Sequence, residues 1–166
     1  MTEIERIVRE LEQAHAGTPW HGPSRAAAVL ADVSPEEAAR RPGRHGHSIW
    51  ALVLHMRAWT GEVARRVREG APRLPVEGDW PEPPAPSAAA WRSAVAALEQ
   101  AHRDLVAAVR EASPGQLDER AGTSDDAALG SGTSYRVMLH GLAQHDAYHT
   151  GQIALLKRLT RDGAAS

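Results

Sequence analysis

The chain contains no cysteine and no phenylalanine, and aromatic residues make up only 4% of its 166 positions. Without cysteine, this chain supplies neither a disulfide framework, nor a thiol nucleophile, nor a zinc–thiolate cluster. Aromatic and β-branched residues favour strands, whereas alanine and leucine, on which this composition leans, favour helices. The composition therefore predicts helices rather than sheets.

Long apolar runs and a strong charge of either sign are also missing. No apolar stretch approaches the ~18 residues that span a membrane, and residues 1–13 lack the apolar core of a signal peptide. The formal net charge is -2 and the isoelectric point is near 6.5, which gives no field that would attract nucleic acid or an anionic membrane. We expect a cytoplasmic protein whose partner is neither nucleic acid nor a membrane.

The length is typical of one domain, so we expect a single domain over residues 1–166. Apolar periodicity and capping signals predict long and short helices. The long helices are expected at residues 4–16, 48–69, 87–112 and 134–159, and the short ones at 24–31 and 34–40. A Pro-rich crossover, 71–87, and a Gly-rich loop expected to be mobile, 113–133, complete the chain. This pattern predicts an all-α four-helix bundle with short extra helices after the first.

Two histidines four residues apart stand in HDAYHTGQI, residues 145–153. On a helix they lie about 40° apart on one face, which is a natural scaffold for a chelate. The same stripe holds Met138, Leu142 and Leu156, so His145 and His149 are expected to point into the bundle. A divalent metal would satisfy both imidazoles, although a pair at this spacing is more often hydrogen-bonded or on the surface.

A third histidine, His55, lies in the apolar segment WALVLHMRAW. Alone, such a histidine is more often a satisfied core residue than a ligand. Histidines on the apolar faces of two separate helices point together to a metal site, because bundle metal sites are built from facing helices. His55, His145 and His149 are therefore the candidate metal ligands, and no catalytic residue can be assigned.

HDAYH also fits the outline of a metalloprotease helix, with Asp146 in the place of the general base. The shorter side chain and the lack of a strand for substrate disfavour a peptidase. Asp146 either accepts a hydrogen bond from a ligand or, as we favour, forms a salt bridge at the surface or between helices. Gln152 either touches a ligand or water at the metal or makes a hydrogen bond at the helix end.

Other residues near the stripe have open roles. Tyr148 and Trp50 are expected to pack, and Trp59 either packs or lines a pocket. Gly141 leaves room either for substrate or for close helix packing. The residues that would rim the pocket or cap turns are Trp20, His21 and His47, and Trp80 is expected to fasten the crossover to the bundle.

The segments TPWHGPS, HSIWALVLHMRAW and LHGLAQHDAYHTGQIALLKR, in this order, resemble the DinB/YfiT-like superfamily of bacterial proteins. The resemblance implies an up-down-down-up four-helix bundle that binds a divalent metal, often nickel or zinc, through three histidines. These fall on His55, His145 and His149. It also implies a homodimer and an activity like that of thiol transferases, which join low-molecular-weight thiols such as bacillithiol or mycothiol to electrophiles, or of a thiol-dependent maleylpyruvate isomerase.

The resemblance and the residues together predict a metal-dependent enzyme acting on a small molecule, either a thiol transferase or a related hydrolase. Three neutral imidazoles leave a metal its full charge and an open position. Because the chain has no cysteine, a thiol would arrive with a cosubstrate. No general acid or base is evident, so a non-catalytic metal-binding or stress-response protein is the alternative. A bundle that acts by association, with its histidines merely buried, is a third interpretation.

Overall fold

The computed structural model describes residues 1–16, 26–43, 46–122, 129 and 132–162. The helices are α1 (Glu3–His15), α2 (Ala26–Leu30), α3 (Pro35–Ala39), α4 (Ile49–Glu69), α5 (Ala88–Glu111), the 3-10 helix η1 (Gly115–Asp118) and α6 (Tyr135–Asp162). Within these ranges the only β pairing is an isolated bridge between Arg120 and Ser134. The all-α prediction is confirmed.

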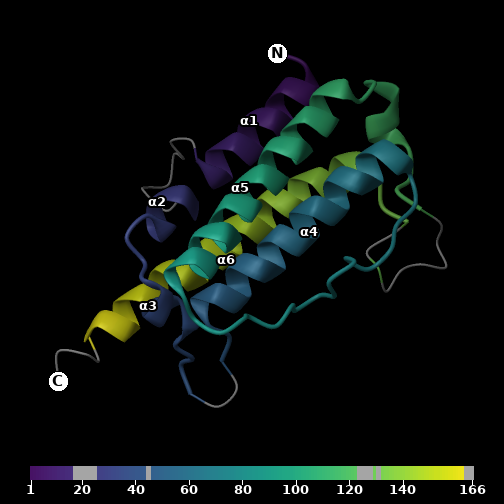
Figure 1. Cartoon of the computed structure of the whole chain (residues 1–166). Helices are drawn as coiled ribbons and strands as arrows, with labels where there is room; N and C mark the ends of the chain where they lie inside the picture. Colours follow the sequence, from purple (N-terminus) through teal and green to yellow (C-terminus); the bar gives the residue numbers. More distant parts are fainter. Residues whose placement is uncertain (17–25, 44–45, 123–128, 130–131, 163–166) are drawn as a thin grey trace.

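The four long helices α1, α4, α5 and α6 form the bundle, and each packs against two others (Figure 1). Helices α4 and α5 run in one direction and α1 and α6 in the other, which is the expected up-down-down-up order. Because α4 and α5 are parallel neighbours, the connection between them must return along the whole length of α4. Helices α2 and α3 lie at one end, where α2 contacts α6 and α3 contacts α4.

Side-chain caps fix the predicted helix starts. Ser48 accepts a hydrogen bond from the backbone N–H of Ala51, and Ser87 accepts one from that of Ala90, which satisfies N–H groups that a helix leaves unpaired at its start. Gly70 ends α4 with a φ of 77°, a left-handed conformation that glycine adopts without steric cost. Local chemistry therefore sets the boundaries of α4, on which one half of the candidate site is built.

Two apolar clusters divide the core along the bundle. One lies where α1, α4 and α5 meet the start of α6 and includes Ile7, Leu105 and Leu139. The other joins α2, α3, α4 and α5 to the later part of α6 and includes Trp50 and Ile153. The candidate histidines, one in the second turn of α4 and two in the middle of α6, lie near the boundary between the two clusters.

The Gly-rich connection differs from the expected loop at both of its described ends. Residues 115–118 form η1, and the side chains of Leu117 and Ala121 are each only 1% exposed. The backbone N–H of Ala121 donates to the carbonyl of Thr133. The buried side chains of Leu117 and Ala121 and the backbone hydrogen bond to Thr133 hold these ends in place. The Gly-rich composition of the segment did not indicate these contacts.

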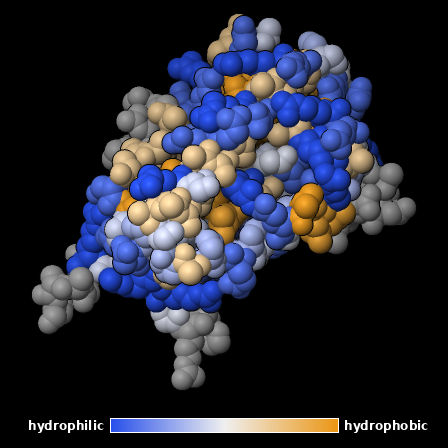
Figure 2. Space-filling view, in the orientation of Figure 1, coloured by the Kyte–Doolittle hydropathy of each residue, from blue (hydrophilic) through white to orange (hydrophobic). Residues whose placement is uncertain are grey.

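The face of the molecule in Figure 2 is mostly hydrophilic, with apolar patches that are small and separate. No helix among the described residues is both long enough and apolar enough to cross a membrane.

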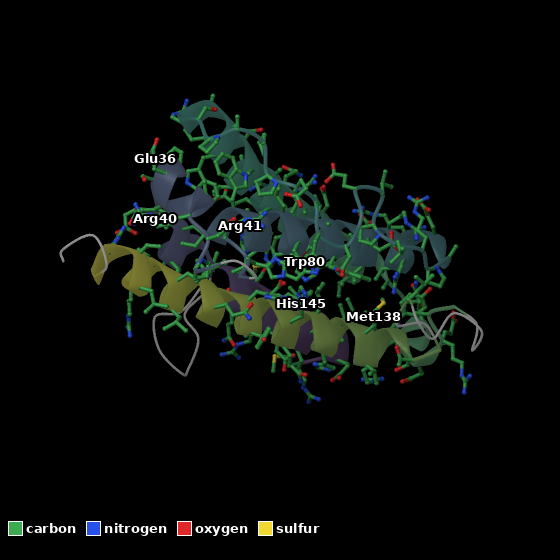
Figure 3. The ribbon with its side chains drawn as sticks, turned by 90° about the horizontal axis from the view of Figure 1, so that it is seen from below. Glu36, Arg40, Arg41, Trp80, Met138 and His145 are labelled. Carbon is green, nitrogen blue, oxygen red and sulfur yellow. The ribbon has the colours of Figure 1, made fainter. Side chains whose placement is uncertain are left out.

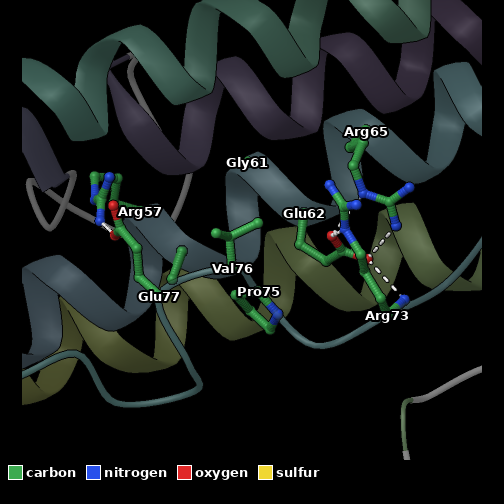
Figure 4. A pocket seen from close by; sticks show the side chains of 9 residues that line it. Arg57, Gly61, Glu62, Arg65, Arg73, Pro75, Val76 and Glu77 are labelled. Carbon is green, nitrogen blue, oxygen red and sulfur yellow. Dashed lines mark hydrogen bonds and ion pairs between the residues drawn. The ribbon is translucent and has the colours of Figure 1, made fainter.

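A buried ion-pair network joins α4 to the crossover (Figure 4). Glu62, 4% exposed, accepts hydrogen bonds from the side chains of Arg65 and Arg66 and from the backbone N–H of Arg73. Arg66 also donates to the carbonyls of Arg73 and Leu129. Burial acts to raise the pKa of Glu62, but the hydrogen bonds from the arginines outweigh it, so this pKa is lowered. The network fastens two connections to one helix.

We predict that Glu62→Ala destabilises the fold by about 3–5 kcal/mol, because it leaves the buried Arg66 guanidinium without its counter-charge. Urea unfolding followed by circular dichroism measures the change. Glu111→Ala, at an exposed glutamate at the end of α5, is the matched control and should change the free energy of unfolding by less than about 0.5 kcal/mol. Equal effects of the two substitutions would contradict a role for this network.

Candidate metal centre

The three candidate histidines meet between α4 and α6. The Nε2 atoms of His55 and His145 are 2.9 Å apart, and one ligand nitrogen from each of the three histidines lies within 4.8 Å of the others. His55 and His149 are buried, and His145 is half-buried. Figure 3 labels His145 on α6 and Trp80 of the crossover, whose ring centroid lies 6.1 Å from that of His149. The structure brings together the three residues that the sequence singled out.

Each imidazole has an oxygen acceptor at its Nδ1 atom. His55 donates to the backbone carbonyl of Asp79 at 2.7 Å. His149 donates to Oε1 of Gln152 at 2.6 Å, and His145 lies 3.3 Å from Oδ1 of Asp146. An acceptor at Nδ1 places the proton there and leaves Nε2 as a lone pair. The Nε2 lone pair of each ring is thereby available, and those of His55 and His145 face each other.

Burial keeps two of these imidazoles neutral at physiological pH. It lowers the pKa of His149 to about 4, against the hydrogen bond to Gln152. It also lowers the pKa of His55, although the carbonyl of Asp79 acts in the opposite direction. Neutral imidazole is the form that binds a metal.

The arrangement fits a divalent cation better than it fits a hydrogen-bonded histidine cluster. With the proton of each ring on Nδ1, the Nε2 atoms of His55 and His145 face each other at 2.9 Å with no hydrogen between them. Two lone pairs at this distance repel, and a cation between them removes the repulsion. Bonds of about 2.0–2.1 Å in a tetrahedral site hold nitrogen ligands roughly 3.3 Å apart, close to the spacing of this pair. The histidines could therefore hold a metal ion.

Cavities reach the cluster from two sides. One of about 480 Å³ includes His149, Trp80, Tyr148 and Gln152 in its wall. A smaller one of about 230 Å³ is bordered by His145 together with Trp59, Arg66, Met138 and Gly141. A metal held by the three histidines would therefore be accessible to a small molecule.

Asp146 and Gln152 both support ligand histidines. Asp146, 4% exposed, lies against His145 and not in the salt bridge that we favoured. Its position on the helix is about 100° from that of His145, but its side chain turns back to the His145 ring. Gln152 contacts His149 and also donates to the hydroxyl of Tyr148 at 3.0 Å. Both therefore act on ligand orientation.

The remaining predictions near the site had mixed outcomes. Tyr148 is 64% exposed, so the expectation that it packs was wrong, whereas Trp50 is fully buried. Trp59 and Gly141 border a cavity, and a Cβ at Gly141 would meet no atom within 4 Å. Gly141 thus leaves open space and is not needed for close helix packing. Trp20 and His21 lie outside the described residues.

Sequence reasoning missed Asp79 and the full role of Trp80. The Trp80 ring stacks on His47 and on His55, with centroid distances of 3.7 and 3.9 Å. The crossover thus forms one wall of the site, and the predicted fastening by Trp80 is made directly on a candidate ligand. No sequence signal marks Asp79, because its contact with His55 arises only when the crossover lies along α4.

Fold and site together define a helical-bundle protein with a candidate three-histidine metal centre. The chain belongs to the DinB superfamily, whose family profile matches residues 21–153. The solved crystal structure of a DinB-like protein from Bacillus subtilis, YjoA, is similar in fold, with a TM-score of 0.65 and 16% sequence identity over 93% of this chain and 92% of that one. No curated protein matches the sequence.

A second pair of buried histidines lies between α1 and α5. The rings of His15 and His102 stack with centroids 4.2 Å apart, they are 6% and 7% exposed, and Nδ1 of His102 has no hydrogen-bond partner among the described residues. Burial lowers the pKa of His102 to about 3. It also lowers the pKa of His15, although the carboxylate of Asp146 opposes this shift. Both rings are neutral at pH 7.

We predict that this pair makes the metal-free protein sensitive to acid. Below about pH 6.5 these histidines bind protons in the unfolded chain but stay neutral in the folded protein. Their contribution to the free energy of unfolding is therefore full above that pH and is lost progressively toward pH 3. The loss is about 1.4 kcal/mol per pH unit for each ring that stays neutral. Urea unfolding in EDTA at about pH 7 and about pH 5 measures it, and His102→Leu should reduce the difference.

His140 provides a control of opposite sign. Burial acts to lower its pKa, but hydrogen bonds to Glu10 and Glu3 outweigh burial and raise it. It therefore contributes stability below its unfolded pKa that is lost as the pH rises through the folded pKa, and His140→Leu should increase the loss in acid. If His102→Leu and the wild type lose the same stability between the two pH values, the buried pair does not cause the sensitivity.

Proposed function

We propose that this protein is a metal-dependent enzyme that binds a divalent ion, nickel or zinc, through His55, His145 and His149. We further propose that it joins a low-molecular-weight thiol to an electrophile, with hydrolysis as a related activity. The observation that supports the proposal best is the orientation of the three rings, each with an oxygen at Nδ1 and a free Nε2. Family membership and the adjoining cavities are consistent with it.

A divalent ion held by the three histidines would supply Lewis acidity that lowers the pKa of a thiol or water. The protein residues hold the three rings in place, and the two apolar clusters limit the access of bulk water. The chain has no cysteine, so the thiol belongs to a cosubstrate. Three protein ligands leave a position for it, as in catalytic and not closed structural sites.

The larger cavity favours an electrophile that is uncharged and largely apolar. Among the described residues, its lining includes Leu52, Leu155 and Leu156 and no Asp, Glu, Lys or Arg. The polar groups available there are His47, Gln152 and the hydroxyl of Tyr148, which can orient a carbonyl or an ether oxygen but cannot neutralise a charge. We therefore propose a small neutral molecule as the second substrate of a cytoplasmic enzyme.

The second candidate function is a non-catalytic metal-binding or stress-response protein. One observation favours it: none of the described residues that line the larger cavity is a carboxylate positioned as a general base. A thiol transferase does not require such a base when the metal itself makes the thiol more acidic, so we favour the enzyme.

We also propose that the protein is a homodimer that associates through the outer face of α6. The exposed side chains of Val137, Tyr148, Leu155 and Leu159 are 54–64% accessible, and spacings of 11, 7 and 4 residues place them on one side of the helix. Tyr148 and Leu155 also line the larger cavity. A second copy at this face would therefore lie beside the substrate cavity.

Elemental analysis of protein purified without a metal-affinity tag tests the metal site. We expect about one nickel or zinc ion per chain, lost in His149→Ala, because two imidazoles hold a divalent ion far more weakly than three. His140→Ala, on the same helix, is the control. Metal bound equally well by all three proteins would place it elsewhere, and no uptake on titration would reject the site.

Screening thiols with neutral electrophiles then separates the two functions. A thiol adduct that forms with the metal-loaded wild type and not with the EDTA-treated protein supports the transferase. A fully loaded protein that forms no adduct and hydrolyses no neutral ester supports the non-catalytic alternative.

The dimer is tested by sedimentation velocity at tens of micromolar protein. We expect the wild type to sediment as a dimer and the double variant Val137→Glu, Leu159→Glu as a monomer, because each substitution buries an unpaired charge in the apolar contact. Val76→Glu, at an 85% exposed apolar residue of the crossover, is the control and should remain dimeric. A monomeric wild type would reject the dimer.

A further inference from the structure

The Pro-rich crossover, residues 70–87, reaches the metal centre at Asp79 and Trp80. Elsewhere it is held by ion pairs and hydrogen bonds on the surface of α4, which include the contacts of Arg73 with the Glu62 network and the ion pair of Arg57 with Glu77. At Asp79 and Trp80 it contacts a candidate metal ligand on two sides. The crossover therefore does more than connect α4 to α5.

Asp79 holds the edge of the His55 ring through two groups. Its backbone carbonyl accepts from Nδ1 of His55 at 2.7 Å, and its carboxylate accepts from Nε1 of Trp59 at 2.6 Å. The carboxylate oxygen Oδ1 also lies 3.2 Å from the same Nδ1. A carbonyl can only accept, so the Nδ1 proton is fixed and Nε2 is left for a metal. Trp59 is one helical turn after His55, so the carboxylate anchors the carbonyl to the helix that carries the ligand.

Trp80 holds the face of the same ring. It lies between His47 and His55, with interplanar angles of 10° and 8°. A flat contact on one face restricts rotation of the His55 ring about its own axis, and a hydrogen bond at the edge restricts its direction. At its Nδ1 edge His145, by comparison, has only the 3.3 Å contact with Asp146 among the described residues. His55 is therefore the ligand whose position depends most on the crossover.

We propose that Asp79 and Trp80 are positioning residues of the metal centre, so that docking of the crossover and binding of the metal stabilise each other. This inference rests on the proposed metal site. Coupling of this kind is reciprocal. A docked crossover strengthens metal binding, and a bound metal strengthens docking of the crossover. Contacts that merely fasten the crossover to α4 would produce neither effect.

Titration with cobalt(II) chloride tests the first direction, because cobalt reports affinity and ligand geometry through its visible absorption. We expect Asp79→Ala to weaken cobalt binding by roughly 10–100-fold, as disruption of an outer hydrogen-bond partner does, and to change the spectrum, because the carbonyl at Nδ1 loses the carboxylate that anchors it to Trp59. Asp79→Asn keeps an oxygen that accepts from Trp59 and should restore most of the affinity. Glu82→Ala removes an acid of the same segment whose side chain is 86% exposed, and it should match the wild type.

Hydrogen exchange of the crossover amides tests the second direction. Cobalt should slow exchange in residues 76–80 of the wild type and have little effect there in Asp79→Ala. Trp59→Phe removes the donor that anchors the carboxylate and should resemble Asp79→Ala, which keeps the test available if one variant folds poorly. Circular dichroism and urea unfolding confirm that each variant is folded.

The outcomes separate this inference from the proposed function. If the wild type binds cobalt and Asp79→Ala binds it with the same affinity and spectrum, the positioning role is overturned and the metal site stands. If the wild type takes up no cobalt, or His149→Ala binds as the wild type does, the metal site itself is overturned, and the positioning role with it.

Discussion

Three imidazoles that converge between α4 and α6 are the feature on which the other parts of the site depend. A buried polar group without a partner is costly. In each ring one of the two nitrogens, Nδ1, has an oxygen partner. The other nitrogen, Nε2, has no oxygen partner among the described residues, and the Nε2 atoms of His55 and His145 face each other. The two apolar clusters at either end of the site provide the packing that tolerates this arrangement, and the middle of the bundle is thereby available for chemistry.

The order of the helices explains why the crossover belongs to the site. Helices α4 and α5 are parallel (Figure 1), so the chain must return along the whole of α4 before α5 can begin. A Pro-rich segment suits this path, because it is extended and does not compete to form helix. On its way it passes His55, and Asp79 and Trp80 make their contacts there. A requirement of topology thus places two groups beside a ligand that no helix of the bundle would supply.

The buried polar groups outside the site have a different character. Glu62 and Arg66 are paired and hydrogen-bonded, and they fasten two connections to α4. His15 and His102 are stacked and neutral, and no described residue forms an ion pair with either ring. Removal of one partner of the Glu62 and Arg66 pair destabilises the fold, whereas burial of His15 and His102 opposes their protonation. Both lie outside the larger cavity, which is lined mainly by apolar and aromatic side chains.

The helices, the bundle and the three candidate ligands could be predicted from the order of residues. Caps such as Ser48 and Ser87 and the apolar stripe around His145 and His149 act within a few residues, so they can be read directly from the order of residues. Tertiary structure alone decided that Asp79 meets His55, that Asp146 turns to His145 and that His15 stacks on His102. The contacts of Asp79 and of the His15 and His102 pair join segments distant in sequence, and that of Asp146 depends on a rotamer set by burial. Local patterns carry no information about either, because both are fixed only when the helices pack.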